Sequence, residues 1–399
     1  MKQAVWQFAT AGNIRFGRGS HYGLCDELDR LGIERPLVVT DKTIRALPGM
    51  AGLWQTLQQR RPSARIFEGG EAEPAVGVAE AAILAGREVA ADGVIALGGG
   101  SNIDVAKIAG IVLKHGGTPR DYFGFDRIPG PGLPLIALPT TAGTGSEVSH
   151  SAVLSDPCVE MKVSTLSRWL RPATAIVDPV LTDSCPKMVT AHSGIDALVH
   201  AIEAYTNREY VDMGDVDPQA RAYEGSYPFT RMLAAEAIRN ISRYIVRAYQ
   251  YPADHEARDG MAYAAMLAGM AFSNSGVALV HALEYPIGIR THCSHGEGNG
   301  LLLPHVMRFN LSSRQQAMLE IYHCLQPEAC NEGAAEAAIE EVVALQQALG
   351  IRQRLRDLGL SRGDIPEMAR KAFQIKRLMD INPRVPDEED LRQILEAAY

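Results

Sequence analysis

Four side chains that can bind a divalent metal ion stand in the second half of the chain. Asp196 and His200 lie in the stretch 194–205, which contains no proline and carries apolar residues at helical spacing. Their spacing of four places the carboxylate and the imidazole one turn apart on the same helix face. His281 and His295 follow further along the chain. Three imidazoles and one carboxylate suit a first-row ion such as Fe(II) or Zn(II) rather than Mg or Ca, so we expect these residues to share one metal ion.

The surroundings of Asp196 decide between this interpretation and a simpler one. An aspartate and a histidine at this spacing are usually a surface pair or a polar contact at a helix end. Here the neighbours Leu198, Val199 and Ile202 are apolar. A carboxylate buried among such residues needs a positive partner, which favours the metal site.

The elements that must position these residues fall into two groups. Short apolar runs predict strands in the first half, and helical stretches separate them; the runs are 35–41, 64–67, 93–97, 133–138 and 173–179. Strands that alternate with helices predict an α/β domain with a mostly parallel sheet. From about residue 187 only helical patterns remain. We therefore predict an α/β domain over 1–186 and an all-helical domain over 187–399.

A glycine loop, Gly98-Gly99-Gly100-Ser101, lies between a predicted buried strand and a helix. Glycines let the backbone approach a ligand closely, and a helix N-terminus offers unpaired N–H groups to a phosphate. Asp104, one turn further on, could orient this loop. A tight turn without a ligand is the alternative, because the pattern is not the G-x-G-x-x-G fingerprint.

A second polar loop follows the next predicted strand. It supplies hydroxyl groups from Thr140, Thr141, Thr144 and Ser146. Together the two loops predict a site for the diphosphate and ribose of a dinucleotide. Asp41 ends the first clear strand, where a carboxylate would accept from the adenosine ribose and repel a 2′-phosphate, so we expect NAD to be preferred over NADP. The alternative role for Asp41 is a helix N-cap.

Composition narrows the possible partners and location. The chain has 399 residues, 46% of them hydrophobic and 22% charged, and a formal net charge of −8, which gives no reason to expect nucleic acid. Neither a long apolar run nor a signal-peptide core is present, so we expect no membrane span. Six scattered cysteines without a C-x-x-C pair predict reduced thiols and a cytoplasmic location.

Taken together, these motifs resemble the iron-containing (group III) alcohol dehydrogenase family. The resemblance runs from about residue 8 to the C-terminus and rests on the glycine loop, Pro139 to Glu147, Asp178-Pro179, the Asp196/His200 helix, and His281 with His295-Gly296. It implies a Rossmann-like NAD-binding domain, a helical metal-binding and catalytic domain of the dehydroquinate synthase-like fold, and a metal in the cleft between them.

The resemblance also implies further contacts and an assembly. By resemblance, Lys162 and Leu181 would face the nicotinamide half of the cofactor. Family members often form homodimers through their N-terminal strands, and residues 5–16 are a plausible exposed edge.

One position departs from the family pattern and bears on the route of the proton. Many members carry a second histidine four residues after the one that matches His281. Here that position is Tyr285, preceded by Glu284. Tyr285 or His292 could carry the proton, and a packing role for Tyr285 is the alternative.

The resulting hypothesis is a metal-dependent NAD(H) alcohol dehydrogenase that interconverts a primary alcohol and its aldehyde. The metal, Fe(II) or as the alternative Zn(II), would act as a Lewis acid, and the cofactor would exchange a hydride with the substrate. The alternatives are a glycerol dehydrogenase-like zinc polyol dehydrogenase, a hydroxyacid–oxoacid transhydrogenase-like enzyme, a dehydroquinate synthase-like lyase and a non-catalytic NAD-binding protein.

Overall fold

Two compact units make up the chain in the computed structural model, which describes all residues except 1–4, 160, 215–220 and 329–333. One unit is Thr10–Cys185. The other is Pro186–Tyr399 together with the N-terminal stretch up to Ala9. The first unit is α/β and the second is helical, which confirms the predicted fold class. The assignment of one domain to the cofactor and the other to the metal remains a prediction.

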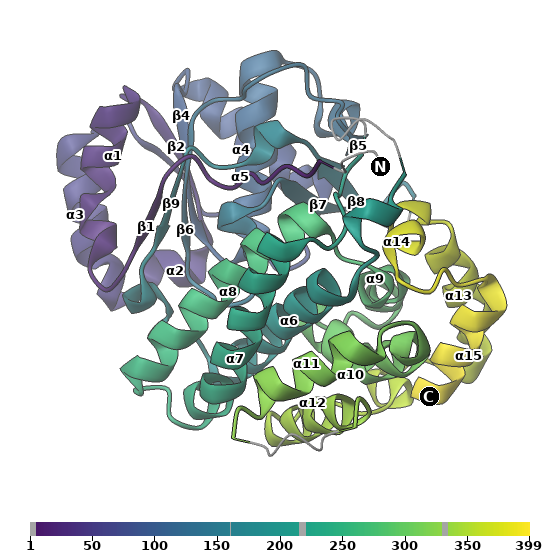
Figure 1. The fold of residues 1–399 in the computed structure, drawn as a ribbon. Coiled ribbons are helices and arrows are strands. Elements are labelled where there is room, and N and C mark those ends of the chain that lie inside the picture. The colour runs from purple at the N-terminus through teal and green to yellow at the C-terminus, as the bar shows by residue number, and fades with distance from the viewer. Residues whose placement is uncertain (1–4, 160, 215–220, 329–333) are drawn as a thin grey trace. The chain divides into compact units, whose positions relative to one another are not determined.

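The α/β unit is built on a six-stranded sheet in the order β1-β9-β6-β4-β2-β3, in which every neighbouring pair is parallel (Figure 1). Its elements are β1 Ile14–Phe16, α1 Leu24–Leu31, β2 Pro36–Val39, α2 Lys42–Ala46, α3 Ala51–Arg60, β3 Arg65–Phe67, α4 Val76–Glu88, β4 Gly93–Gly98, α5 Gly100–His115, β5 Gly124–Phe125, β6 Leu135–Pro139, β7 Ser151–Asp156, β8 Met161–Leu166 and β9 Thr174–Val177.

Helices cover both faces of this sheet because its central strands are apolar on both sides. In β2, Leu37 and Val39 belong to a core cluster with residues of α4 and α5, whereas Val38 belongs to a second cluster with residues of α1 and α3. Alternate residues of a strand point to opposite faces, so one continuous apolar run supplies both layers. Figure 1 shows α1 and α3 on one side of the sheet and α4 and α5 on the other.

A second, three-stranded sheet was not predicted from the sequence. Its order is β5-β8-β7, with β7 and β8 antiparallel and β5 parallel to β8. Residues of β7 alternate between buried and partly buried. The hairpin is rich in serine and carries Lys162, so its composition resembles that of a loop.

The helical unit begins with α6, the helix that carries Asp196 and His200. Gly194 lets neighbouring helices approach, because a Cβ atom there would lie 2.8 Å from Ile245 on α7 and 3.0 Å from Met261 on α8. The helices are α6 Lys187–Thr206, α7 Pro228–Gln250, α8 His255–Ser275, α9 Leu279–Thr291, α10 His295–Asn310, α11 Gln315–Leu325, α12 Ala337–Ala348, α13 Ile365–Phe373, α14 Lys376–Ile381 and α15 Glu388–Ala398.

The N-terminal arm, residues 5–9, is held by the helical unit. The backbone of Ala9 exchanges two hydrogen bonds of 2.9 Å with the side-chain amide of Asn274. The Tyr227 hydroxyl donates to the Gln7 carbonyl at 2.8 Å, and the Trp6 ring stacks on Tyr227 with centroids 4.4 Å apart. Of the predicted edge 5–16, therefore, only Ile14–Phe16 forms a strand, and β1 is an edge strand of the six-stranded sheet.

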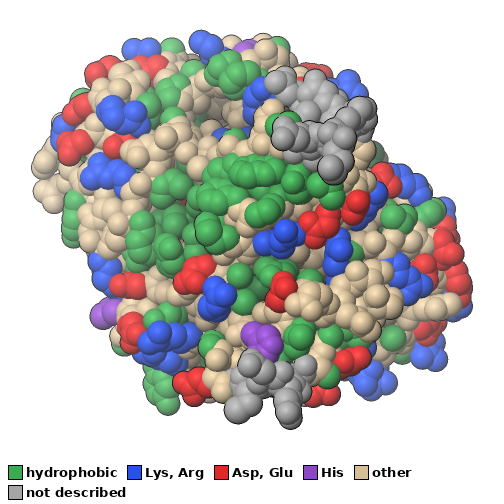
Figure 2. Space-filling model, viewed as in Figure 1, with side chains coloured by type: hydrophobic (Ala, Val, Ile, Leu, Met, Phe, Trp, Pro, Cys, Tyr) green, Lys and Arg blue, Asp and Glu red, His purple; other side chains and the backbone are tan. Residues whose placement is uncertain are grey.

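Charged side chains of both signs are interspersed on the molecular face drawn in Figure 2. Among the described residues no single helix has the length and apolarity to cross a membrane. The pair α8 and α9 satisfies length and composition only together, across a bend of 104°.

Candidate functional site

Three of the four predicted metal ligands come together within the helical unit. Asp196 on α6, His281 on α9 and His295 at the start of α10 each offer a ligand atom, and these atoms all lie within 4.8 Å of one another. Asp196 and His281 are buried, each with 2% of its surface exposed. Three helices thus contribute one ligand each, and the three ligands are far apart in the sequence or lie on different helices.

The fourth predicted ligand, His200, lies beside this cluster but does not belong to the group whose ligand atoms all lie within 4.8 Å of one another. Its Nε2 is 3.9 Å from Oδ2 of Asp196, one helical turn away. The His200 ring stacks between Phe272, at 4.3 Å, and His281, at 4.9 Å. His200 is therefore a neighbour of two cluster members and is held by ring packing.

The charge of Asp196 is stabilised by its surroundings. Burial by itself would raise the pKa of this carboxyl group. The imidazoles of His200, His295 and His281 and a hydrogen bond from Asn299 outweigh burial and lower the pKa to about 2. The Asn299 amide donates to Oδ1 at 2.8 Å. An anionic ligand is thus held ready among imidazoles.

The donor atoms fit a first-row metal ion. Nε2 of His281 is buried and has no hydrogen-bond partner among the described residues, while Nδ1 of the same ring is 2.6 Å from Glu203. A buried polar atom without a partner is costly unless a ligand satisfies it. The third imidazole, His295, has its Nε2 3.1 Å from Nδ2 of Asn299, so coordination through that nitrogen would replace this contact. Imidazole and carboxylate donors are those that Zn(II) and Fe(II) accept.

Glycines at the start of α10 let His295 approach Asp196. A Cβ atom on Gly296 would lie 2.0 Å from the backbone oxygen of His192 on α6. One turn later, a Cβ on Gly300 would lie 2.9 Å from Ile195. The two helices can pack this closely only because both positions lack a side chain.

The two candidates for proton transfer occupy different environments. Tyr285 is 5% exposed, and its ring centroid lies 6.1 Å from that of His295. His292 is exposed and forms the left-handed C-cap of α9, with φ of 55°. The geometry favours Tyr285 over His292.

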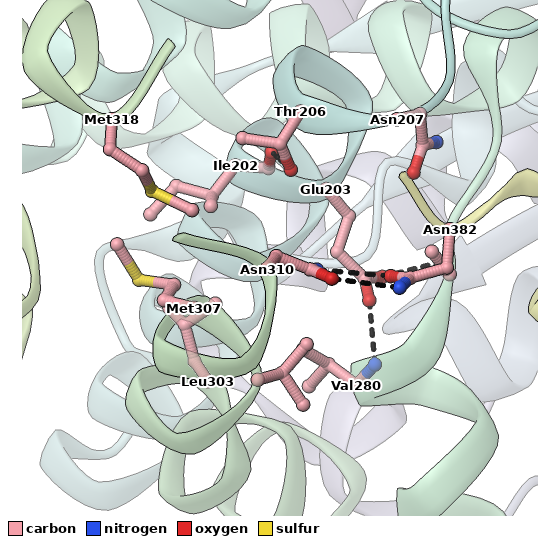
Figure 3. A pocket seen from close by; sticks show the side chains of 12 residues that line it. Ile202, Glu203, Thr206, Asn207, Val280, Leu303, Met307, Asn310, Met318 and Asn382 are labelled. Atoms are coloured by element: carbon pink, nitrogen blue, oxygen red, sulfur yellow. Dashed lines mark hydrogen bonds between the residues drawn. The ribbon is translucent and has the colours of Figure 1, made fainter. Parts of the chain in front are cut away.

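Glu203 also lines a small cavity in the helical unit. Val280 and the paired amides of Asn310 and Asn382 line it, as does the hydrocarbon of Ile202, and Figure 3 shows Glu203 pointing toward the backbone of Val280. None of the four predicted metal ligands is among its described lining residues. The cavity is therefore separate from the proposed metal site.

The two predicted cofactor loops meet within the α/β unit. Strands β4 and β6 are parallel neighbours with Gly98 opposite Pro139, so the loops that follow them are adjacent. A Cβ atom on Gly100 would lie 2.6 Å from the Thr144 side chain, and one on Gly99 would lie 3.6 Å from Thr141. A glycine turn that opens a 16-residue helix, α5, beside threonine hydroxyls fits the phosphates of a dinucleotide.

Asp104 and Ser146 brace these loops from inside. Asp104 accepts from the Ser146 hydroxyl at 2.6 Å and from the backbone N–H of Val153 at 2.9 Å. The ammonium group of Lys107 donates to Ser146 at 2.9 Å and to the Ser149 hydroxyl at 3.0 Å. Burial lowers the pKa of Lys107 to about 8. Asp104 and Ser146 therefore shape the loop, and a direct contact with the cofactor remains a prediction.

The carboxylate of Asp41 is engaged on both oxygens. Oδ1 accepts from the backbone N–H of Ile44 at 2.9 Å, which makes Asp41 the N-cap of α2. Oδ2 accepts from the Asn102 amide at 2.8 Å. The alternative role weighed from the sequence is thus present, and a contact with ribose remains a prediction.

The remaining predicted cofactor residues differ in exposure. Lys162 is 6% exposed, and its ammonium lies 2.8 Å from the Glu73 carboxylate. Leu181 belongs to the core cluster that also contains Ile176 and Leu24. Its side chain therefore packs in the core. Of the loop residues, Thr140 is buried and Ser101 and Thr141 are partly buried.

Sequence reasoning missed three residues of the candidate metal site. Glu203 and Glu284 contact the Nδ1 atoms of two predicted ligands, and Asn299 contacts Asp196. The available signal was a glutamate within an otherwise apolar helical stretch, at 203 and again at 284. The contacts themselves join separate helices, which no local pattern records.

Family models match both halves of the chain. A model described as iron-containing alcohol dehydrogenase matches residues 11–179. A second, described as the C-terminal part of the Fe-containing alcohol dehydrogenase family, matches residues 222–399. Together they cover most of the sequence.

Individual relatives match almost end to end. The chain is 36% identical to long-chain-alcohol dehydrogenase 1 of Geobacillus thermodenitrificans over 96% of this chain and 94% of that protein. It is 31% identical to the NAD-dependent methanol dehydrogenase of Bacillus methanolicus, over 96% and 97%. A solved structure of 1,3-propanediol oxidoreductase superposes with a TM-score of 0.91 at 31% identity, over 99% of this chain and 100% of that one.

Proposed function

This chain belongs to the iron-containing alcohol dehydrogenase family, and we propose that it interconverts a primary alcohol and its aldehyde with NAD(H). The observation that carries the proposal is the cluster of Asp196, His281 and His295, of which the first two are buried and the third is partly buried. Relatives named as alcohol dehydrogenases and matched over nearly their whole length support the same reaction class.

The chain's own residues supply position and electrostatics. When bound, a metal held by Asp196, His281, His295 and the adjacent His200 supplies Lewis acidity, and the nicotinamide cofactor exchanges the hydride. The burial of Asp196 and His281 keeps water from competing at these donor atoms. The low pKa of Asp196, about 2, keeps its carboxylate anionic at working pH.

The proton of the alcohol must leave the site, and we assign its relay to the Tyr285 hydroxyl, which would donate its own proton onward as it receives that of the alcohol. Its buried ring lies against His295, whereas His292 is exposed at the end of α9. Tyr285→Phe removes the hydroxyl and keeps the ring. The variant should lose turnover and keep metal affinity, and an unchanged rate would return Tyr285 to a packing role.

NAD is the proposed cofactor in preference to NADP. One relative is named as NAD-dependent, and Asp41 places a carboxylate after β2, where a 2′-phosphate would be repelled. Comparing rates with NADH and NADPH at equal concentration tests this preference. A homodimer is also proposed, since β1 is at the edge of the six-stranded sheet. Its test is the molar mass in solution.

The substrate class is a primary alcohol, but relatives differ in the chain length they act on. Their names run from methanol to long-chain alcohols. A panel of straight-chain alcohols and diols, followed by NADH absorbance, should show one preferred length. The protein should be loaded with Fe(II) and with Zn(II) separately.

The decisive variant is His281→Ala. Loss of this imidazole should abolish turnover because the metal loses a buried ligand, while NADH binding measured by fluorescence should persist. His323→Ala, on α11 in the same unit, is the control and should retain activity. Full activity in His281→Ala would refute the proposed metal site.

A further inference from the structure

Two of the clustered imidazoles each have a buried carboxylate behind them. Oε2 of Glu203 lies 2.6 Å from Nδ1 of His281, and Oε2 of Glu284 lies 2.5 Å from Nδ1 of His295. Glu203 is 3% exposed and Glu284 is fully buried. Carboxylates are seldom buried to this degree unless hydrogen bonds hold them.

The contacts of Glu203 determine which partner donates. Besides His281, its two oxygens accept from the backbone N–H groups of Ala278 at 2.9 Å and of Val280 at 2.7 Å. A backbone N–H can only donate, so Glu203 accepts in both of these bonds, which favours Nδ1 of His281 as the donor of the third. A neutral imidazole with its proton on Nδ1 carries its lone pair on Nε2.

The second ring nitrogen of His281, Nε2, is buried and is left without a hydrogen-bond partner among the described residues. It is therefore the nitrogen left for a cation. Glu203 also holds the first turn of α9, so the same carboxylate fixes the backbone that carries His281 and the orientation of its ring.

Glu284, the second carboxylate, is likewise held by close packing beside the histidine that it contacts. A Cβ atom on Gly298 would lie 2.9 Å from Cγ of Glu284, so a glycine lets α10 pass directly over this side chain. His295 opens the same helix. The bond from its Nδ1 to Glu284 fixes the plane of the ring against α9.

We propose that Glu203 and Glu284 are positioning residues that hold His281 and His295 with Nδ1 protonated and Nε2 available to the metal. The proposal rests on the metal site of the proposed function. Partners of this kind typically contribute 10–100-fold to metal affinity. Neither carboxylate is expected to touch substrate or cofactor.

The test measures binding of Co(II) and Zn(II) to protein stripped of metal, by visible absorbance and by competition with a chelator. Glu203→Gln and Glu284→Gln should each weaken binding about 10–100-fold. The control is Glu297→Gln, because Glu297 is equally buried on α10 but pairs with Arg352, at 2.6 and 2.7 Å, instead of a ligand. Its affinity should stay close to that of the parent.

A spectroscopic signature separates positioning from a general loss of structure. The amide of a glutamine can donate to Nδ1 and move the ring proton to Nε2. Nitrogen NMR of histidine-labelled, metal-free protein should therefore show a changed tautomer for His281 in Glu203→Gln and for His295 in Glu284→Gln. An unchanged tautomer together with parental affinity would overturn the proposal.

The variant His281→Ala distinguishes failure of the positioning role from failure of the proposed metal site. If His281→Ala binds Co(II) like the parent, the metal site itself is wrong. If His281→Ala loses the metal while both glutamine variants keep it, the site stands and the positioning role is wrong. Should Glu203→Gln fail to fold because α9 loses its first-turn acceptor, Glu284→Gln decides the proposal.

Discussion

At the scale of single residues, two ionisable groups, Glu147 and Lys107, are buried next to the polar loops of the α/β unit. Glu147 is 3% exposed, and burial raises its pKa to about 7, with Lys107 acting in the opposite direction. Such a group resists ionisation in the folded state. Its charge state therefore couples the stability of this loop to pH.

The stability of the protein should reflect this carboxyl group. A raised folded-state pKa means that its stabilising contribution is complete below the unfolded value of 4.5 and is lost as pH rises through about 7. Glu147→Gln does not titrate. The melting temperature of the parent should therefore fall relative to that of Glu147→Gln between these pH values, by the equivalent of at most about 3 kcal/mol. A difference that stays constant with pH would contradict this expectation.

At the scale of elements, the start of α10 determines whether the metal ligands can meet. Its glycines face α6 and α9 alternately: Gly296 and Gly300 lie against α6, and Gly298 lies against Glu284 of α9. Helix α10 thus packs closely against both α6 and α9 at positions where it carries no side chain. Side chains at these positions would push His295 away from Asp196.

Gly296→Ala tests this packing. The added Cβ would meet a backbone oxygen, which cannot rotate aside, so we expect destabilisation of at least about 1–3 kcal/mol and weaker Co(II) binding. Gly52→Ala on α3 is a matched control, because a Cβ there meets nothing within 4 Å. It should be neutral or stabilising by up to about 1 kcal/mol. Equal melting temperatures and affinities for the two variants would show that the close approach is unimportant.

Sequence periodicity predicted the elements with strong patterns and missed those formed by tertiary contacts. The apolar run before Asp41 and the helix around Asp196 were both found, because elements buried on all sides consist of nearly continuous apolar residues. The β7–β8 hairpin was missed because its residues are serine-rich and its pairing is specified by neighbours. Glu203 and Glu284 were missed as partners of the histidines for the same reason: each bond links two elements.

At the scale of the whole molecule, the residues of each predicted site belong to one compact unit. The candidate metal ligands lie in the helical unit, and the glycine and threonine loops lie in the α/β unit. The predicted fold class followed from the change in pattern near residue 187. Family membership then extended the prediction from architecture to reaction.

Removal of the metal should abolish activity at the metal site without affecting NADH binding at the cofactor site. A chelator should abolish alcohol oxidation, and Fe(II) or Zn(II) should restore it, while NADH binding by fluorescence stays within the error of the parent. Metal at 100 times its dissociation constant should stabilise the protein by about 2.7 kcal/mol. Activity that survives exhaustive chelation would contradict a metal-dependent mechanism.

The attachment of Ala9 to Asn274 has a consequence for how this protein is made. Residues 5–9 complete a unit whose other members follow residue 185 and are translated after the α/β unit, whereas Thr10–Cys185 leaves the ribosome as one uninterrupted segment. Domains generally fold as they emerge, so the sheet can form while the arm still waits for its partner amide. The arm can therefore pair with the helical unit only after Asn274 has been synthesised.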